Sequence, residues 1–411
     1  RAVFNYADKY LLTATIRRDG SSKFGKNNKY GNFPSVAAKW NISSEDFMKG
    51  SSVFSSLALR GSWGITGNQE FPAGASQEQF GFNSYNNPGQ FNVANPDLKW
   101  ESTKAYNIGL DFSFNKGRIY GSIDYYNKNT TDILFQSTAI QPAPATIYFI
   151  NLPAKLNNKG IEFQIGAALI DKANFGLDLS FNIANNKNLL TEFFAPGTKT
   201  PIVIETGQIN GQGVSGTLAQ RITNGHPVNV YYLKKFTGFV NGVQQIESTP
   251  SYAGDPNPHT VYGFAANIRY KKFSMSINAG GAGGFLIYNN TATNITNIEG
   301  ITKGRNIDVA AYNSEEKTTS AALASTRFLE KGDYFKLRNA TIRYNFGNVG
   351  NYVKGITAFV SGSNLLVLTK FTGFDPEVNI DKSQDNYPSR SIEYIPYPTP
   401  RTITFGLNFS L

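Results

Sequence analysis

The stretch that decides the fold is Thr402–Leu411, TITFGLNFSL, in which apolar residues alternate strictly with small or polar ones. Successive side chains of a β-strand point to opposite faces, so this alternation predicts a strand with one apolar and one polar face. The apolar face includes the aromatic residues Phe405 and Phe409. The same pattern returns along the whole chain, and its apolar face keeps including aromatics. It therefore indicates a wall between lipid and water rather than a packed core.

Three predicted hairpins repeat this pattern. Each is a pair of alternating runs joined by a few turn residues, such as Asn115, Lys116 and Gly117. The hairpins cover residues 106–125, 161–183 and 262–277. Further strands are predicted over residues 9–18, 32–42, 57–66, 334–346 and 356–364, with a short strand over 3–6. Residues 44–47 predict a single capped helical turn.

The connections between these strands alternate in length. Those after Tyr6, Phe114, Ile170 and Tyr270 have a few residues. Those near residues 68–98, 130–158, 186–258, 283–332 and 366–400 are long. Compact soluble domains rarely contain structureless loops beyond about 15 residues. The sequence therefore predicts an all-β fold, an antiparallel transmembrane β-barrel segment of about twelve strands, with short periplasmic turns and long extracellular loops.

The composition agrees with this class. No run of about 18 apolar residues occurs, which excludes a helical membrane span. The mean hydropathy of −0.31 is compatible with a barrel, because half of every barrel strand is polar. The chain has no Cys, so neither a disulfide framework nor a thiolate metal site is expected. The net charge of +10 is dispersed in short pairs, so nucleic acid is not an expected partner.

Charged residues follow the polar face of the predicted strands. A Lys or Arg that faces lipid at the bilayer midplane costs about 2–4 kcal/mol, so these residues are expected to face the lumen. They are Arg60, Asp111, Asp124, Glu162, Asp178 and Arg269. We expect most of them to be salt-bridged wall residues rather than catalysts. Lys336 and Arg338 break the alternation of their strand, where a bulge or the membrane surface is predicted.

Aromatic residues in or beside the long connections are candidates for contacts with a ligand or with a covering protein. Their flat rings match the C–H faces of sugars and also anchor protein partners. The candidates are Trp100, Tyr148, Phe149, Tyr231, Tyr232, Phe236 and Tyr252. Most of them are expected to pack the loops together.

Three motifs are better explained by structure than by chemistry. Residues 211–216 match a dinucleotide-binding glycine pattern but lack a surrounding βαβ unit. His226 and His259 adjoin loop prolines and have no partner at metal-ligand spacing. Asp375 and Glu377 are expected to structure a loop. No catalytic residue, metal site or cofactor is predicted.

Eight short stretches carry a family resemblance that covers nearly the whole chain. They are Ser22–Gly25, Tyr30–Ser35, Leu59–Gly64 with Gly67–Gln69, Asn95–Glu101, Lys159–Glu162, Asp333–Asn339, Asn364–Leu366 and Gly373–Glu377. Each stretch alone is weak evidence for a family, but the eight stretches in this order are specific evidence. With them the chain resembles the C-terminal half of the barrel of a SusC/RagA-type TonB-dependent outer-membrane transporter of the Bacteroidetes.

The resemblance implies an importer whose barrel has about 22 strands and holds a plug domain in its lumen. It implies that residues 1–411 are the C-terminal portion of the barrel, without the plug domain, the TonB box and the first strands. The implied partners are a SusD-like surface lipoprotein, TonB through that missing N-terminal region, outer-membrane lipid or lipopolysaccharide, and a second transporter–lipoprotein pair. Many relatives have an acidic, calcium-loop-like run after the stretch matching Phe236–Gly242. The segment Val243–Pro258 offers only Glu247 and Asp255, so no metal is carried over.

The implied substrates are oligosaccharides, with peptides as the alternative within the family. From the residues alone, a secreted all-β adhesin or glycan-binding module remains a second hypothesis, in which both faces would pack against protein or water. A passive porin remains a third, and it would need no plug domain.

Overall fold

The computed structural model describes residues 1–82, 88–138, 142–145, 147–211, 213–317, 322–349, 353–380 and 387–410. Within these residues, thirteen strands belong to a long antiparallel sheet, which confirms the predicted fold class. The chain divides into two compact units, residues 1–162 with 187–202 and residues 163–186 with 203–411. None of the helices that the structure describes is long and apolar enough to cross a membrane.

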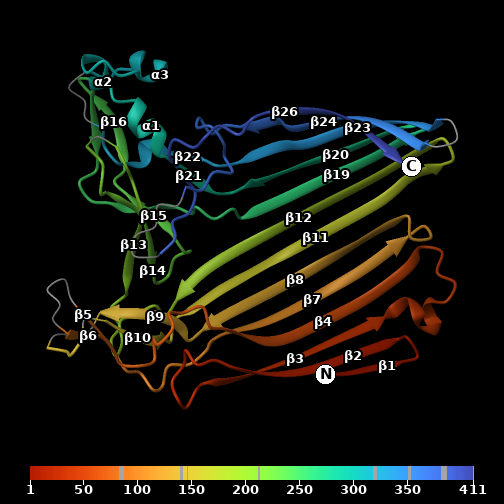
Figure 1. The fold of residues 1–411 in the computed structure, drawn as a ribbon, viewed down its shortest axis with the longest axis horizontal. Coiled ribbons are helices and arrows are strands. Elements are labelled where there is room, and N and C mark those ends of the chain that lie inside the picture. Colours follow the sequence, from red (N-terminus) through yellow and green to blue (C-terminus); the bar gives the residue numbers. More distant parts are fainter. Residues whose placement is uncertain are drawn as a thin grey trace. The chain divides into compact units, whose positions relative to one another are not determined.

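The first unit is built on strands that pair with their neighbours in chain order (Figure 1). They are β1 (Ala2–Tyr6), β2 (Tyr10–Gly20), β3 (Tyr30–Asn41), β4 (Phe54–Asn68), β7 (Glu101–Phe114) and β8 (Ile119–Thr131). The predicted short strand and hairpin are therefore confirmed. Strand β11 (Lys155–Lys172) begins in this unit and starts six residues before its predicted run.

The turns of this unit follow from backbone geometry. Ala7, Asp8, Asn115 and Lys116 all have positive φ values, between 48° and 55°. Tight antiparallel hairpins favour such residues, because the twist of these turns matches that of the strands. Two short 3₁₀ helices, η1 (Ile42–Ser44) and η2 (Asp46–Met48), replace the single helical turn predicted over 44–47.

Glu45 explains why the predicted turn is split. Its carboxylate accepts hydrogen bonds from Lys9 Nζ at 2.9 Å and from Trp40 Nε1 at 3.0 Å. Lys9 lies in the turn before β2 and Trp40 lies on β3, so these bonds hold Glu45 in an extended conformation with φ −78° and ψ 150°. That conformation ends one 3₁₀ turn and begins the next.

The long connections of the first unit contain a small sheet of their own. Its strands are β5 (Gln79–Phe82), β6 (Pro88–Val93), β10 (Ile147–Leu152) and β9 (Ile133–Thr138), in that order. They lie at one end of the long strands of this unit (Figure 1). These connections were expected to be loops, so strand content here exceeds the prediction. The pairs are short and lack the long alternation that identified the wall strands.

The second unit also pairs its long strands in chain order. They are β12 (Phe175–Thr191), β19 (Thr260–Tyr270), β20 (Phe273–Gly283), β23 (Tyr334–Val349), β24 (Val353–Thr369) and β26 (Thr402–Ser410). The predicted hairpin over 262–277 and the terminal strand are confirmed. Leu411, the last residue of the deciding stretch, lies outside the described residues.

A β-bulge lies where the alternation of β23 breaks. The register of β23 shifts between Leu337 and Asn339 against β24, and opposite it the register of β20 shifts between Asn278 and Ala279. Arg338 is the inserted residue. A bulge changes which residues share a face, so Lys336 joins the polar side while Ile342 stays on the apolar side. The predicted bulge is confirmed.

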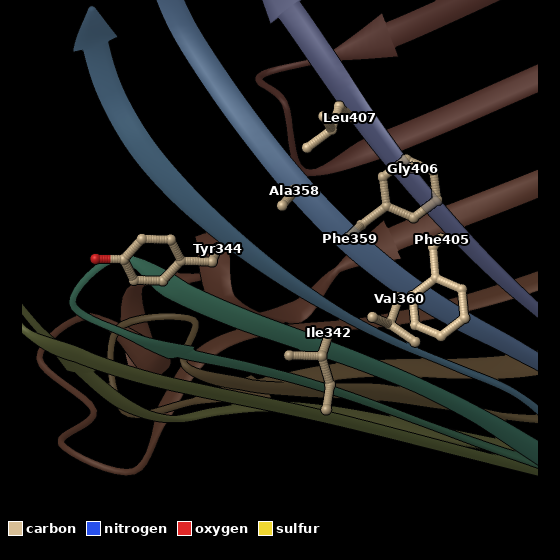
Figure 2. A pocket seen from close by; sticks show the side chains of 8 residues that line it. All are labelled: Ile342, Tyr344, Ala358, Phe359, Val360, Phe405, Gly406 and Leu407. Atoms are coloured by element: carbon tan, nitrogen blue, oxygen red, sulfur yellow. The ribbon is translucent and has the colours of Figure 1, made fainter.

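The apolar face of the second unit is exposed. A hollow of about 570 Å³ lies on β23, β24 and β26. Figure 2 shows the side chains that line it. Ile342, Val360 and Phe405 form one cross-strand row of its lining, and Tyr344, Ala358 and Leu407 form the next. Phe405 is 76% exposed. Large apolar side chains exposed in rows are unusual on a water-facing surface and are expected on a lipid-facing one.

The long connections of the second unit form a second set of small elements, drawn at one end of its strands in Figure 1. They are β13 (Val203–Gln208), β14 (Leu218–Thr223), β15 (Val230–Leu233), β16 (Phe236–Val240), β17 (Val243–Ile246), β18 (Ser251–Gly254), β21 (Leu286–Asn289), α1 (Asn290–Ile295), α2 (Glu299–Thr302), α3 (Val309–Tyr312), η3 (Thr326–Phe328), β22 (Leu329–Lys331) and β25 (Ile392–Glu393). A buried cluster that includes Ile209, Tyr231, Tyr288 and Ile392 joins β14, β15, β21, η3 and β25.

Candidate functional site

Three of the predicted lumen-facing residues meet on the polar face of the first unit. Arg60 Nη2 lies 2.6 Å from Asp124 Oδ2, and Arg60 Nε lies 3.0 Å from Asp111 Oδ1. Asn107 Oδ1 accepts a third bond from Arg60 at 3.3 Å. Lys39 lies 3.8 Å from the second oxygen of Asp111. The result is a network of both signs on the polar face of these strands.

Strand register and one glycine make this network possible. Arg60 on β4, Gly109 on β7 and Asp124 on β8 are cross-strand neighbours in one row. A Cβ at position 109 would lie 2.5 Å from Asp124 Oδ1 and 2.7 Å from Arg60 Cζ. The missing side chain of Gly109 therefore leaves the space in which the ions meet. Asp124 is 8% exposed, and its Oδ1 has no hydrogen-bond partner among the described residues.

The other three predicted lumen residues lie outside this network. Glu162 lines a hollow of about 390 Å³ beside Tyr126 and Lys128. Arg269 pairs with Asp171 at 3.1 Å, and this pair is exposed. Asp178 lies opposite Asn267 in the register of β12 and β19.

Two of the loop aromatics are buried in the first unit. Trp100 packs against Phe24 and Phe33, with ring centroids 4.8 and 5.3 Å apart. Phe149 belongs to the same cluster and is 4% exposed. Tyr148 is its half-buried neighbour on β10. Trp100 and Phe149 therefore pack the connections together, the role expected for most of these aromatics.

The cluster of Phe24, Phe33, Leu98, Trp100 and Phe149, here called the rim cluster, joins stretches that the sequence presents far apart. Gly25 N donates to Leu98 O at 3.0 Å. Lys23 Nζ donates to Gln69 O at 3.3 Å. Four of the stretches that carry the family resemblance thus meet at one place. The family resemblance depends on the order of these stretches in the sequence. That order does not indicate that the stretches are in contact.

The loop aromatics of the second unit have three different environments. Tyr231 is fully buried, and its hydroxyl donates to Ser391 O. Burial raises the pKa of the Tyr231 hydroxyl well above its ordinary value. Phe236 packs near Arg327, whose Cζ is 5.7 Å from the ring centroid. Arg327 is held by two bonds to Glu316, at 2.6 and 2.7 Å.

Tyr232 and Tyr252 lie in the third environment, a partly exposed stack. The Arg221 guanidinium carbon lies 3.5 Å from the Tyr232 ring centroid. The Tyr232 and Tyr252 rings meet edge to face at 5.1 Å, and the His226 ring stacks on Tyr252 at 3.7 Å. We call these four residues the Tyr stack. The contact of His226 with Tyr252 was not predicted.

The bulge of β23 carries a second ionic cluster, here called the loop latch. Lys336 Nζ lies 2.6 Å from Asp375 Oδ1 and 2.8 Å from Glu377 Oε2. Arg338 also donates two bonds to Glu377. Burial acts to raise the pKa of Glu377, but hydrogen bonds from Arg338, Lys336 and Tyr334 outweigh it and hold that pKa at about 2. Asp375 and Glu377 thus fasten the connection after β24 to the strand wall.

The remaining motifs keep their structural explanations. The glycine-rich stretch 211–216 connects β13 and β14, which are antiparallel, so no βαβ unit surrounds its described residues. Its Gln212 lies outside the described residues. His259 contacts Asp255 at 3.0 Å. No group of three or more potential metal ligands is found in the described part of the chain.

Comparison with known proteins agrees with this architecture. The family model "TonB dependent receptor-like, beta-barrel" matches residues 1–365. TonB-dependent receptor P3 of Formosa agariphila is 30% identical over 464 residues, which cover 99% of this chain and 44% of the relative. TonB-dependent receptor SusC of Bacteroides thetaiotaomicron is 29% identical over 445 residues, which cover 99% of this chain and 43% of the relative. The chain thus spans less than half the length of these relatives.

Solved structures show the same fold. The RagAB peptide transporter superposes with a TM-score of 0.82 at 21% identity, covering 99% of this chain and 46% of that one. The open-open state of the RagAB peptide importer gives 0.84 at 21% identity, covering 100% and 46%. With the apolar and polar faces of the strands and the match over residues 1–365, these results show that the chain belongs to the TonB-dependent receptor β-barrel family of the bacterial outer membrane, and that it is of the SusC/RagA type.

Proposed function

We propose that this chain forms part of the barrel of an importer that takes up oligosaccharides across the outer membrane, together with a SusD-like lipoprotein and with energy supplied through TonB. The observation that carries the proposal is the contrast between the two faces of the wall. In the first unit, one face has Arg60, Asp111 and Asp124 in an ionic network, and the other face exposes apolar side chains such as Leu59 and Ile123. A wall of this kind separates water from lipid.

The proposed contacts with substrate or lipoprotein are the aromatics that keep exposed surface. Tyr252 is 43% exposed, and Tyr148, Tyr232 and Phe236 are half-buried. The polar face supplies further contacts through Glu162, Asp178 and Arg269. In this proposal the protein moves its substrate without making or breaking a bond in it, and the plug domain of the complete transporter moves under TonB.

A peptide substrate is the second candidate. Its motivation is the description of the solved structures with a TM-score above 0.8 as a peptide transporter and a peptide importer. At about 21% identity these structures support the fold alone. The relative SusC of Bacteroides thetaiotaomicron is more similar in sequence, at 29% identity. Family membership favours either importer over a secreted adhesin.

The proposal is tested by deleting the gene for the full-length transporter in its own bacterium. Growth is measured with single oligosaccharides or single peptides as the carbon source. We expect growth to be lost on one or more oligosaccharides and kept on peptides. Deletion of TonB should give the same losses, and the tagged transporter should co-purify with a surface lipoprotein. Growth lost only on peptides would establish the second candidate, and growth independent of TonB would favour a passive porin.

A further inference from the structure

The Tyr stack is fixed by strand register rather than by loop conformation. Tyr232 on β15 and Tyr252 on β18 are cross-strand partners, and the register shifts between Tyr231 and Tyr232. Tyr231 and Tyr232 are adjacent on β15, and successive side chains of a strand point to opposite faces. Tyr231 therefore enters the core while Tyr232 faces outward. Rings held by a strand pair lose little conformational freedom when a ligand arrives, which favours binding.

A planar ion pair lies at one end of the Tyr stack. Glu205 on β13 and Arg221 on β14 are cross-strand partners. Glu205 Oε1 accepts from Arg221 Nη2 at 2.7 Å and from Arg221 Nε at 3.2 Å. Both bonds use the same oxygen, so Oε2 remains available as an acceptor. The Glu205 side chain is 47% exposed, which leaves it open to a ligand.

We propose that Glu205, Arg221, Tyr232, Tyr252 and His226 form a binding site for a neutral saccharide unit. The proposal rests on the proposed function and names part of the surface that would bind the substrate. A sugar ring has apolar C–H faces and hydroxyl groups around its edge. The ring surface of the Tyr stack matches the former, and the ion pair and the tyrosine hydroxyls match the latter.

The charge of the site selects among ligands. Glu205 neutralises Arg221, so a charged ligand finds no unpaired opposite charge here. Peptides are commonly bound by main-chain pairing at an open sheet edge. The Tyr stack instead offers side-chain surface across β14, β15 and β18. These features favour a neutral sugar over a peptide or an acidic glycan.

The test uses the full-length transporter purified in detergent with its lipoprotein. Binding is measured on an array of neutral glucan, mannan and galactan oligosaccharides, uronic-acid oligosaccharides and random peptides. The dissociation constant of the strongest neutral oligosaccharide is then measured by calorimetry. We expect Tyr252→Ala to weaken binding about tenfold and Tyr252→Phe, which keeps the ring, to weaken it much less. Glu205→Gln should also weaken binding.

Tyr312→Ala is the matched control, because Tyr312 on α3 is 66% exposed and is not part of the Tyr stack. It should bind like the wild type. Unchanged oligosaccharide binding by Tyr252→Ala, while the wild type binds and supports growth on that sugar, would overturn this site and leave the proposed function intact. A wild type that binds and imports only peptides would overturn both. Loss of peptide or uronic-acid binding alone in Tyr252→Ala would overturn the neutral-sugar assignment.

Discussion

Lys336 and Glu377 are 41 positions apart in the sequence, yet Lys336 Nζ lies 2.8 Å from Glu377 Oε2. The side chain of Lys336 is only 6% exposed, so this contact is shielded from solvent. The bond joins the connection after β24 to the bulge of β23. The loop latch therefore fixes part of this long connection to the strands of the wall.

Replacing Lys336 with Met should release this connection. Asp375 would lose its hydrogen bonds from a charged partner, each worth about 1.5–3 kcal/mol, whereas Glu377 would keep its bonds to Arg338. We expect new protease cleavage within residues 370–401 of the full-length transporter in detergent, detected by mass spectrometry. Lys354→Met, at the far end of β24, is the matched control and should leave the cleavage pattern unchanged. An unaltered pattern in both variants would show that the latch does not hold the loop.

Acid should open the same latch. The pKa of Glu377 is about 2, below its ordinary value of 4.5, so the stabilisation is complete above about pH 4.5 and is lost as the pH falls through about 2. Pepsin, which is active in this range, should cleave residues 370–401 increasingly between pH 4 and pH 2. In Glu377→Gln this added dependence should be absent. Equal pH dependence in the wild type and the variant would contradict the assignment.

The rim cluster should tolerate no side chain at position 25. A Cβ there would lie 1.8 Å from Pro96 O, a backbone atom that cannot turn aside. We expect Gly25→Ala to expose the connections of the first unit to protease on whole cells. Gly89→Ala is the control, because a Cβ at that position meets no atom within 4 Å. Comparable cleavage of the two variants would mean that the close approach of Gly25 and Pro96 does not constrain the rim.

The two arginines that the sequence placed on the polar face should differ in stability. Removing Arg60 leaves Asp124, which is 8% exposed, beside an empty space, and Arg60→Met should lower the free energy of unfolding by about 3 kcal/mol. Arg269→Met breaks one exposed pair and should cost no more than about 1 kcal/mol. Urea unfolding in lipid vesicles measures both. Equal losses would show that burial does not separate them.

The alternation of β26 predicts opposite responses at adjacent positions. Leu407 is 58% exposed on the apolar face, and Leu407→Lys should cost about 2–4 kcal/mol and reduce insertion into the outer membrane. Asn408→Lys, on the other face, should insert normally. The amount of folded protein is measured by heat-modifiable migration on gels. Similar yields for the two variants would place both side chains in the same environment.

Periodicity predicts the wall of this protein better than its loops, for a physical reason. A strand that separates lipid from water must alternate over its whole length, so Ile403, Phe405 and Leu407 reveal its direction and faces. The sequence also predicts the break in alternation at Arg338, because a cation in a row of apolar residues that faces lipid would be costly. The short strands β5, β6, β9, β10 and β13 to β18 lie outside the long sheet and follow no long period.

The site was less predictable because it depends on distance between segments. Sequence reasoning found Arg60, Asp111 and Asp124 singly, since each falls on the polar face. The pattern gives no signal for Gly109, which matters because it lacks a side chain and so leaves room for Arg60 and Asp124. Nor did sequence reasoning find that His226 stacks on Tyr252, because that contact comes from the pairing of short strands in a long connection.

The connection between β4 and β7 is tied at both ends to one short loop. Gln69 receives a bond from Lys23, and Leu98 receives one from Gly25. Lengthening a chain segment between fixed ends adds little closure entropy. Insertions between these ties are therefore entropically tolerable, whereas the pairing of β6 with β10 and the buried Ala75 restrict which of the existing residues can be replaced.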